Sequence, residues 1–234
     1  MMERYERNII IDGFGRAGQE KLARAKVLVV GAGGLGSPVI MYLAAAGIGT
    51  LGIVDHDTVD VTNLQRQIIH GTGDIDRRKV DSARDSVGAV NPDMTVITYP
   101  EKFTGDNAAE LVAGYDFVVD CCDNYDAKYL INDVCVACGK PYSHGAILAM
   151  RGEAMTYVPG HADYRAVFPS PPEDGMQPTA AQAGALGAIA GVIGSVQAAE
   201  VIKYITGIGE LLTDRILIVN GLTMTFNTLR VKAR

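Results

Sequence analysis

Residues 26–55 read KVLVVGAGGLGSPVIMYLAAAGIGTLGIVD, and this stretch decides the fold. It opens with the apolar run Lys26–Val30, which is typical of a strand buried on both faces. A glycine-rich turn follows. Ser37–Ala46 then predicts a helix, with Pro38 in the first turn, where proline is tolerated. Thr50–Asp55 predicts the next strand, so the stretch forms a β-Gly-α-β unit.

The chain that follows continues this alternation of strands and helices. Helices predicted over Arg77–Val90 and Ala127–Cys138 lie between short strands at Thr95–Tyr99, Asp116–Asp120 and Pro141–His144. Such alternation predicts a mostly parallel sheet with helices on both faces. We therefore expect a Rossmann-like, doubly wound α/β fold.

The last third of the chain departs from the alternation. Gly152–Val158 alternates apolar and polar residues, as an antiparallel strand does. Residues 159–180 hold five of the nine prolines and predict a long crossover loop. Ala181–Ile205 predicts one long helix, and Asn220-Gly221 predicts a two-residue hairpin between antiparallel C-terminal strands. No domain boundary is visible, so residues 1–234 are expected to form a single domain.

The composition is that of an ordinary globular protein with an acidic balance. Hydrophobic residues make up 48% of the chain, charged residues 21%, and the net charge is −6. Such a chain lacks the electrostatic footprint of a nucleic-acid or membrane-surface binder, so we expect neither partner. No basic-then-apolar leader opens the sequence, and polar residues interrupt the apolar stretch Ala183–Val196 before it could span a bilayer. These features favour a cytoplasmic protein.

The four cysteines, Cys121, Cys122, Cys135 and Cys138, lie in one short window. They make a poor disulfide framework for a chain of this length. Cys135 and Cys138 form a C-x-x-C pair, but a structural zinc site usually needs two such pairs. The histidines show no ligand spacing. We therefore predict no zinc site and interpret the pair as part of one apolar helix.

The glycines of the turn predict a phosphate-binding loop. Gly31, Gly33 and Gly34 would allow a tight turn and the close approach of a nucleotide. The helix that begins near Gly36 offers free N–H groups and a partial positive charge to phosphate. Asp55 closes the second strand, where a carboxylate can accept hydrogen bonds from ribose hydroxyls. Nucleotide binding is the favoured interpretation, and a turn that serves packing alone is the alternative.

The glycine loop by itself does not separate NAD from ATP, but the residues after it do. Asp57 is a second carboxylate, surplus for a dinucleotide. Residues 63–67 read NLQRQ, Lys79 follows, and Asp123-Asn124 come after the strand that ends at Asp120. Because the carboxyl ends of strands face the ligand crevice in such sheets, Asp123 and Asn124 are expected near the phosphates.

These side chains suit nucleotidyl transfer to a carboxylate. In that reaction a carboxylate attacks the α-phosphate and pyrophosphate leaves, so cations must neutralise the charge on the phosphates. Arg66 and Lys79 could do so directly, and Asp123 could hold Mg²⁺. A single basic residue more often lies on a solvated surface. The joint position of these residues beside a phosphate loop favours the catalytic interpretation.

Taken in order, these motifs resemble the ThiF/MoeB/HesA family, bacterial relatives of ubiquitin-activating enzymes. Residues 4–9 (RYERNI) and 168–172 (FPSPP) resemble further family segments, so the resemblance covers nearly the whole chain. It implies a homodimer that binds MgATP and adenylylates the C-terminal glycine carboxylate of a small ubiquitin-like sulfur carrier, similar to ThiS or MoaD. It also implies ribose contact for Asp55, phosphate contacts for Asn63, Arg66, Gln67 and Lys79, metal binding for Asp123, and contact of Arg7 with the phosphates of the neighbouring subunit.

Two features depart from the family pattern. Many members bind zinc through two C-x-x-C pairs, but Asp163-Tyr-Arg-Ala166 replaces the first pair here, and residues 232–234 end the chain without the second. Many members also have a crossover-loop cysteine, and Ala180 stands in its place within residues 179–184. A methyl group cannot form a thioester or persulfide. Either the reaction stops at the acyl adenylate, or the cysteine was replaced in this sequence.

Other functions stay open. An NAD-dependent oxidoreductase would fit the glycine loop but leaves Arg66, Lys79 and Asp123 unexplained. A non-catalytic scaffold that binds nucleotide and carrier would fit Ala180. Within the family, the substrate could be a carboxylate on a modified tRNA, which the acidic net charge disfavours. The pathway that the carrier would serve, thiamine or molybdopterin biosynthesis or another sulfur-transfer route, also stays open.

Overall fold

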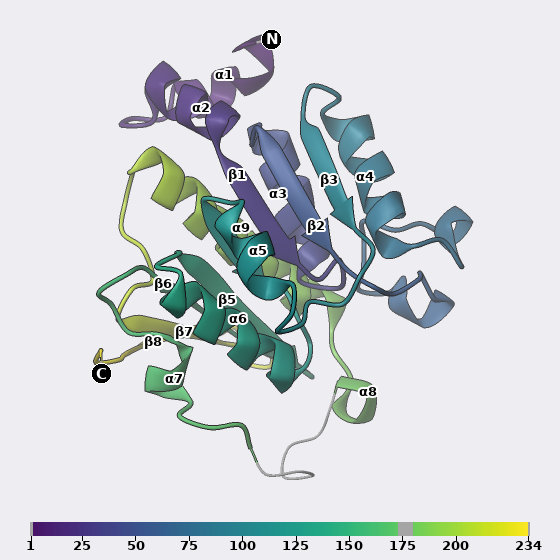
Figure 1. Cartoon of the computed structure of the whole chain (residues 1–234), viewed down its shortest axis with the longest axis vertical. Coiled ribbons are helices and arrows are strands. Elements are labelled where there is room, and N and C mark those ends of the chain that lie inside the picture. The colour runs from purple at the N-terminus through teal and green to yellow at the C-terminus, as the bar shows by residue number, and fades with distance from the viewer. Residues whose placement is uncertain (1, 173–179, 234) are drawn as a thin grey trace.

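The computed structural model of the chain describes residues 2–172 and 180–233. The alternation of strands and helices follows the predicted order (Figure 1). In the described residues the elements are η1 (Met2–Tyr5), α1 (Glu6–Ile9), α2 (Gly15–Arg24), β1 (Lys26–Val30), α3 (Gly36–Ala46), β2 (Thr50–Val54), η2 (Val61–Asn63), η3 (Thr72–Asp74), α4 (Lys79–Val90), β3 (Thr95–Tyr99), α5 (Ala108–Ala113), β4 (Phe117–Asp120), α6 (Tyr125–Ala137), β5 (Tyr142–Leu148), β6 (Arg151–Tyr157), α7 (Tyr164–Val167), α8 (Ala180–Ala183), α9 (Gly187–Thr206), β7 (Arg215–Asn220) and β8 (Thr225–Arg230).

Within the described ranges, eight strands form one sheet in the order β3-β2-β1-β4-β5-β6-β7-β8. The pairs from β3 to β5 are parallel, and those from β5 to β8 are antiparallel. This confirms the predicted doubly wound α/β fold with antiparallel C-terminal strands. The strand order reverses between β1 and β4. In open α/β sheets this is the point where the carboxyl ends of the strands leave a crevice for a ligand.

The central strands are buried on both faces, as their apolar sequences predict. Val27 and Val29 of β1 pack into a core cluster with α3, α4 and α9. Leu28 and Val30 pack into a second cluster with α5 and α6 on the opposite face. This division follows from the period of two along a strand. Figure 1 shows α5 and α6 in front of the sheet and α3 and α9 behind it.

The helix predicted over Ala181–Ile205 is broken, which corrects the sequence interpretation. α8 ends at Ala183 and α9 begins at Gly187. Between them Gly184 has a φ of +79°, in the left-handed region that favours glycine. The Gly184 carbonyl accepts a hydrogen bond from the backbone N–H of Ala149 at 2.8 Å, and the backbone N–H of Leu186 donates to the Ala149 carbonyl at 3.0 Å. Pairing with the turn after β5 thus takes backbone groups that a continuous helix would use.

The predicted two-residue hairpin at Asn220-Gly221 was also wrong. Asn220 pairs with Thr225, so the connection has four residues, 221–224. The backbone N–H of Gly221 donates to the carbonyl of Met150 at 2.7 Å, outside the hairpin. This bond to the neighbouring β5–β6 turn holds Gly221 away from a two-residue turn geometry. The crossover segment 159–180 contains α7, and its residues 173–179 lie outside the described part of the chain.

By length and composition α9 could cross a membrane, contrary to the expectation for this segment. Its contacts are those of a core helix. Ile193 and Val201 belong to the core cluster behind the sheet. The buried carboxylate of Glu200 accepts hydrogen bonds from the Thr156 hydroxyl of β6 and from the backbone N–H of Leu212, both at 2.7 Å. These polar contacts tie α9 to the sheet.

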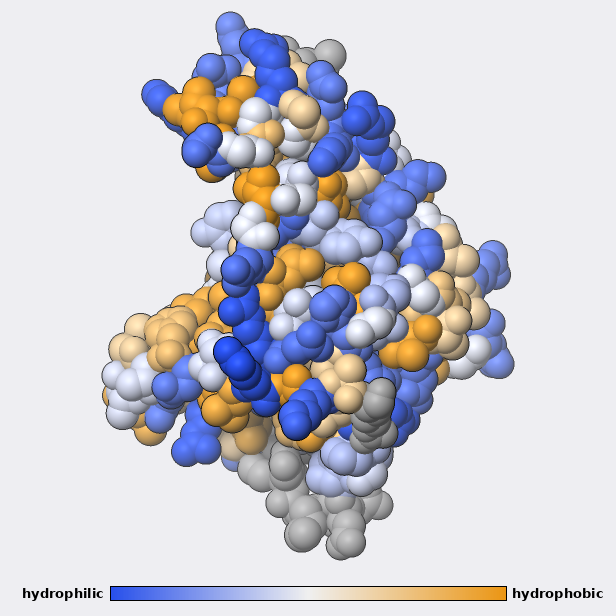
Figure 2. All heavy atoms as spheres, turned by 90° about the vertical axis from the view of Figure 1, so that its left-hand side faces the viewer, coloured by the Kyte–Doolittle hydropathy of each residue, from blue (hydrophilic) through white to orange (hydrophobic). Residues whose placement is uncertain are grey.

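The two ends of the molecule are more exposed. Helices α1 and α2 project at the top, above the sheet (Figures 1 and 2). On the left of Figure 1, β8 is an edge strand whose side chains are all exposed. Figure 2, which views the molecule from the side where β8 lies in Figure 1, shows hydrophobic residues at the surface. The exposed large apolar side chains of β8 and the turn before it are Leu222, Met224, Phe226 and Leu229.

Candidate nucleotide site

The glycine-rich turn after β1 brings the backbone to the crevice between β1 and β4. Gly31 has a φ of +100°, and a Cβ there would lie 2.7 Å from the carbonyl oxygen of Cys121. A Cβ at Gly36 would overlap the carbonyl oxygen of Gly31. These two glycines are therefore required by the turn itself. Gly33 and Gly34 instead border an open cavity.

A cavity of about 710 Å³ opens over this turn. Gly36, Asn63 and Arg7 do not line it. The residues from the sequence analysis that do line it are Gly31, Gly33, Gly34, Asp55, Asp57, Arg66, Gln67, Lys79, Asp123 and Asn124. Segments that are distant in the sequence thus converge on the crevice where the strand order reverses.

Asp55 lies at the end of β2 and supports the glycine loop. One carboxylate oxygen accepts a hydrogen bond from the backbone N–H of Ala32 at 2.8 Å, and the other accepts one from the backbone N–H of Asp57 at 2.9 Å. A carboxylate has room for about four hydrogen bonds, so two positions stay open to a ribose. The sequence analysis expected only the ribose role and missed the contact with the loop.

Lys79 and Asp57 form an ion pair on the cavity wall. The ammonium nitrogen lies 2.8 Å from a carboxylate oxygen of Asp57, and the lysine side chain is 7% exposed whereas that of Asp57 is 51% exposed. Burial raises the pKa of Asp57, but the hydrogen bond and charge of Lys79 outweigh it and hold the pKa below its ordinary value. The extra carboxylate noted in the sequence therefore orients a buried cation that lines the cavity.

The NLQRQ segment borders the cavity through Arg66 and Gln67. Asp60 caps η2 by accepting from the Thr62 backbone N–H at 2.8 Å, while Asn63 accepts from the Asp60 backbone N–H at 3.3 Å. Asn63 thus serves the turn that presents Arg66 and Gln67. The guanidinium of Arg66 donates to the Thr62 carbonyl at 3.0 Å.

The side-chain amide of Gln67 is buried beside the glycine loop. Its side-chain oxygen has no hydrogen-bond partner in the described residues, although the residue is only 4% exposed. The Gln67 amide nitrogen would lie 3.4 Å from a Cβ at Gly33. A buried polar group next to a cavity is best satisfied by a ligand or water within that cavity.

Asp123 and Asn124 follow β4 and begin α6. The Asn124 side chain accepts from the Ala127 backbone N–H at 2.9 Å, which makes it the N-cap of the helix. Its amide nitrogen lies 3.5 Å from a carboxylate oxygen of Asp123. The Asp123 carboxylate is exposed to the cavity and makes no ion pair within the described ranges. A free carboxylate beside a predicted phosphate site fits Mg²⁺, which takes one or two carboxylates and keeps water ligands.

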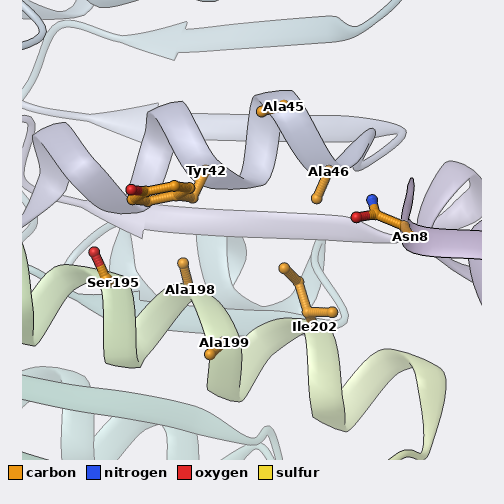
Figure 3. Close-up of a pocket in the computed structure, with 8 residues that line it drawn as sticks. All are labelled: Asn8, Tyr42, Ala45, Ala46, Ser195, Ala198, Ala199 and Ile202. Atoms are coloured by element: carbon orange, nitrogen blue, oxygen red, sulfur yellow. The ribbon is translucent and has the colours of Figure 1, made fainter. Parts of the chain in front are cut away.

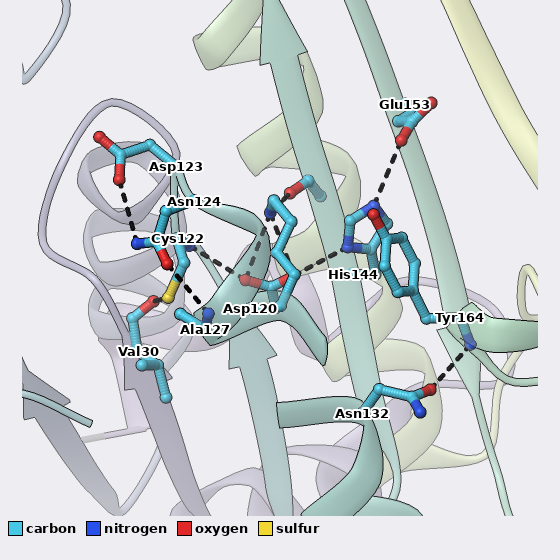
Figure 4. A network of polar contacts seen from close by, with 12 residues as sticks. Val30, Asp120, Cys122, Asp123, Asn124, Ala127, Asn132, His144, Glu153 and Tyr164 are labelled. Carbon is cyan, nitrogen blue, oxygen red and sulfur yellow. Dashed lines mark hydrogen bonds and ion pairs between the residues drawn. The ribbon is translucent and has the colours of Figure 1, made fainter. Parts of the chain in front are cut away.

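A buried charge network lies under the cavity and was not found from the sequence (Figure 4). Asp120, at the end of β4, accepts from the Lys128 ammonium at 3.2 Å and contacts the Nδ1 of His144 at 2.8 Å. The ammonium also donates to the Gly145 carbonyl at 2.7 Å. The Nε2 of His144 lies 3.5 Å from Glu153. The network joins β4, β5, β6 and α6.

The charges of this network stabilise one another. Burial raises the pKa of Asp120, but the charge of Lys128 and the hydrogen bond from His144 outweigh it and lower the pKa below the ordinary value. Burial lowers the pKa of Lys128, and the charge of Asp120 reverses that effect. No spacing in the sequence marks these residues, because His144 meets Asp120 through the pairing of β4 with β5, and Lys128 reaches Asp120 from α6.

The cavity has a second half beyond Asp123 and Asn124. Its walls come from the ends of β5 and β6, from α7 and from β7. Its lining residues include Lys128, Ala146, Ile147, Leu148, Arg151, Glu153, Tyr164 and Ile218. The cavity therefore extends past the residues predicted to bind phosphate and continues along the antiparallel part of the sheet.

Arg7 lies away from this cavity, on α1. It is exposed, and its neighbour Asn8 lines a separate groove of about 290 Å³. Figure 3 shows Tyr42 of α3 and Ser195 and Ile202 of α9 on the two sides of that groove. Within this chain Arg7 does not join the residues predicted to bind phosphate.

The cysteines have different surroundings. Cys121 and Cys122 line the cavity, and burial raises the pKa of both thiols well above the ordinary value. Cys135 is buried in α6, and Cys138 is the exposed C-cap of that helix. Thiols that resist ionisation are poor nucleophiles, so these two cavity cysteines are suited to packing.

Comparison with known proteins identifies the family. The model of the ThiF family matches residues 5–234. A protein named probable adenylyltransferase/sulfurtransferase MoeZ, from Mycobacterium tuberculosis (strain CDC 1551 / Oshkosh), is 46% identical in an alignment of 234 positions, which covers 98% of this chain and 60% of that protein. The chain thus spans less than two thirds of the length of this curated relative.

Two further comparisons agree. A protein named sulfur carrier protein adenylyltransferase, from Thermus thermophilus, is 43% identical over 99% of this chain and 88% of its own length. The crystal structure of E. coli MccB with MccA-N7isoASN has a TM-score of 0.89 at 22% identity, and covers 99% of this chain and 72% of that one. This structural likeness supports the fold, and the family match together with the sequence identity decides the assignment. The chain belongs to the ThiF family.

Proposed function

We propose that this chain binds ATP in the main cavity and transfers its AMP group to the C-terminal glycine carboxylate of a ubiquitin-like sulfur carrier protein. The observation that carries the proposal is the convergence of Arg66, Lys79 and Asp123 on a glycine loop, in one cavity. The name of the Thermus thermophilus relative supports the carrier as substrate class.

The residues have distinct roles in the proposed reaction. Asp55 would accept hydrogen bonds from the ribose while it holds the loop at Ala32. Lys79, oriented by Asp57, and Arg66 would donate to the phosphate oxygens. Mg²⁺ at Asp123, when bound, would supply further positive charge to the phosphates. These groups would stabilise the charge that builds during transfer.

The chemical step is a substitution at phosphorus. A carboxylate oxygen of the carrier forms a bond to the α-phosphorus, and the bond from that phosphorus to the oxygen bridging to the β-phosphate breaks. The electron pair leaves with pyrophosphate. The products are the carrier acyl adenylate and pyrophosphate. The second half of the cavity would hold the carrier tail so that its carboxylate reaches the α-phosphate.

Two structural features support a protein substrate and a second copy of the chain. The exposed apolar side chains of β8 and its turn are typical of a surface that binds a protein. Arg7 is exposed and lies outside its own cavity, so it could reach phosphates only in another copy. We therefore propose a homodimer in which each Arg7 serves the partner site. Light scattering at working concentration checks the dimer.

Ala180 and residues 163–166, which stand where many family members have cysteines, determine the rest of the proposal. We propose that residues 1–234 act as one catalytic domain without zinc and stop at the acyl adenylate. Residue 179 lies outside the described residues, and Ala180 begins α8. Intact-mass spectrometry after turnover should show no covalent bond between enzyme and carrier, and metal analysis should show no zinc. A carrier-linked enzyme or stoichiometric zinc would contradict these points.

Pyrophosphate exchange tests the proposed reaction. Labelled pyrophosphate should enter ATP only when a carrier with an intact C-terminal Gly-Gly is present, and a carrier that lacks the last glycine is the control. Asp123→Ala should abolish the exchange. Binding of ATP and carrier without exchange would instead indicate a scaffold, and exchange driven by a tRNA would indicate the tRNA-linked carboxylate.

A thermal-shift measurement separates ATP from NAD. A ligand at a hundredfold excess over its Kd stabilises the folded state by about 2.7 kcal/mol. For a chain of this size that corresponds to a rise in Tm of roughly 5–11 °C. ATP with magnesium should give this rise and NAD should give none. A rise with NAD alone would contradict the proposal.

A further inference from the structure

Arg151 and Glu153 point into the second half of the cavity. A Cβ at Gly152 would overlap Ile193 of α9, so Gly152 faces α9. Side chains alternate along a strand, and Arg151 and Glu153 must therefore point to the opposite face. Both line the cavity. The strand β6 thus presents a cation at its first residue and an anion two residues farther along.

Glu153 does not neutralise Arg151. Its carboxylate lies 3.5 Å from the Nε2 of His144, whose Nδ1 is held by Asp120 at 2.8 Å. No contact between Arg151 and Glu153 falls within ion-pair distance among the described residues. The charge network therefore holds Glu153 on the inner side of the cavity, away from Arg151.

The rest of the sheet face also offers Arg151 no acidic partner. The register places Leu148 of β5 and Asn220 of β7 opposite it. In residues 2–172 and 180–233 its guanidinium forms no side-chain hydrogen bond or ion pair. In contrast, Lys79 pairs with Asp57 and Lys128 pairs with Asp120. Arg151 is thus an exposed, uncompensated cation at the β6 side of the cavity, where no phosphate-binding residue lies.

We propose that Arg151 determines carrier specificity by binding an acidic side chain in the carrier tail, upstream of the terminal glycines. This inference rests on the proposed function. The guanidinium presents five N–H donors in a planar fork that matches a carboxylate. In the proposed reaction the reacting carboxylate would meet the α-phosphate in the part of the cavity that the glycine loop lines, so an anion at Arg151 would be a second one. An extended tail advances about 3.3–3.6 Å per residue, which lets a residue a few positions upstream reach Arg151.

The test is a charge swap between enzyme and tail. The probe is a carrier that supports exchange, made with Asp, Ala or Lys in turn at each of the three positions before its Gly-Gly. Arg151→Glu reverses the charge and Arg151→Met removes it. Arg24→Glu is the control, because Arg24 is an exposed arginine in the last turn of α2 and does not line the cavity.

At one of the three tail positions, the unaltered enzyme should have a KM for the Asp carrier about tenfold below that for the Lys carrier, the size expected of a single partly exposed charge-assisted contact. Arg151→Glu should reverse this order, Arg151→Met should abolish it, and Arg24→Glu should preserve it. Calorimetric binding of the same carriers gives the preference without catalysis.

Some results would overturn the inference. One is a tail preference that Arg151→Glu leaves intact. Another is a shift in the KM for ATP rather than for carrier, which would make Arg151 a phosphate contact. Failure of the proposed function looks different, because the unaltered enzyme would then show no exchange with any carrier while binding still reports on Arg151.

Discussion

Neutralising Asp120 is expected to destabilise the folded chain, because the ammonium group of Lys128 is then buried without an anion. Asp120 is 1% exposed, and its carboxylate pairs with Lys128 at 3.2 Å and His144 at 2.8 Å. In Asp120→Asn the Lys128 ammonium stays buried at 6% exposure without an anion. Removing one partner of a buried ion pair costs about 3–5 kcal/mol. For a chain of this length that lowers Tm by roughly 6–20 °C.

A double-mutant cycle separates this charge effect from a packing effect. Lys128→Met alone should cost a similar amount, because it leaves Asp120 uncompensated. The double variant buries neither charge, so its loss should be smaller than the sum of the two single losses by about 1–3 kcal/mol. Urea unfolding followed by circular dichroism measures each free energy of unfolding. The control is Arg77→Met at the exposed Arg77–Asp85 pair, where little change is expected.

The pH dependence of the same network has a defined sign. The pKa of Asp120 is below its ordinary value of 3.8, so its contribution is present above that pH and is lost as the pH falls through the folded-state pKa. The pKa of Lys128 is above 10.5, so its contribution is lost only as the pH rises past that value. Additive losses in the cycle, or an Asp120→Asn variant as stable as the parent at neutral pH, would refute the reasoning.

Three further predictions concern the cavity and its surroundings. Gly36→Ala should abolish ATP binding in calorimetry, because the added methyl group would overlap the carbonyl of Gly31. The control is Gly88→Ala in α4, whose methyl group would meet no atom within 4 Å and should leave ATP binding unchanged. Equal ATP binding by the two variants would contradict the close-packed turn. Lys79→Ala should lower the exchange rate about 10- to 100-fold, the range for a lost hydrogen bond to a charged group, and an unchanged rate would remove Lys79 from the phosphate site. Iodoacetamide at pH 8 should modify the exposed Cys138 first, because burial raises the pKa of the other three thiols. Peptide mass spectrometry shows the order of modification, and a cavity cysteine modified before Cys138 would contradict this prediction.

The convergence of the glycine loop, Asp55 and Asp123 on one cavity was largely predictable because its signals are local. Gly31, Gly33 and Asp55 fall at the ends of two strands that the apolar runs reveal, and the sheet then brings strand ends together. Asp123 follows β4 for the same reason. The pairing of Lys79 with Asp57 needed the structure, since the sequence shows only that both side chains lie near the crevice.

The part of the cavity that β5, β6 and β7 line was not predictable, because it depends on how separate strands pair. Lys128 and His144 carry no motif. His144 meets Asp120 through the β4–β5 register, and Lys128 reaches Asp120 because α6 packs over the sheet. In the sequence Arg151 is one charged residue among many. Only the structure shows that Gly152 faces α9, so that the Arg151 side chain points to the opposite face.

By itself the sequence determined the order of elements and the doubly wound sheet, because buried runs, glycine turns and helix signals act over a few residues. Only the tertiary structure decided where these local signals do not determine the observed element. Backbone pairing with Ala149 breaks the helix predicted over 181–205, and the bond from Gly221 to Met150 sets a four-residue turn. Tertiary structure also decided which charges are compensated, because an ion pair depends on distance in space, and spacing along the chain does not encode that distance.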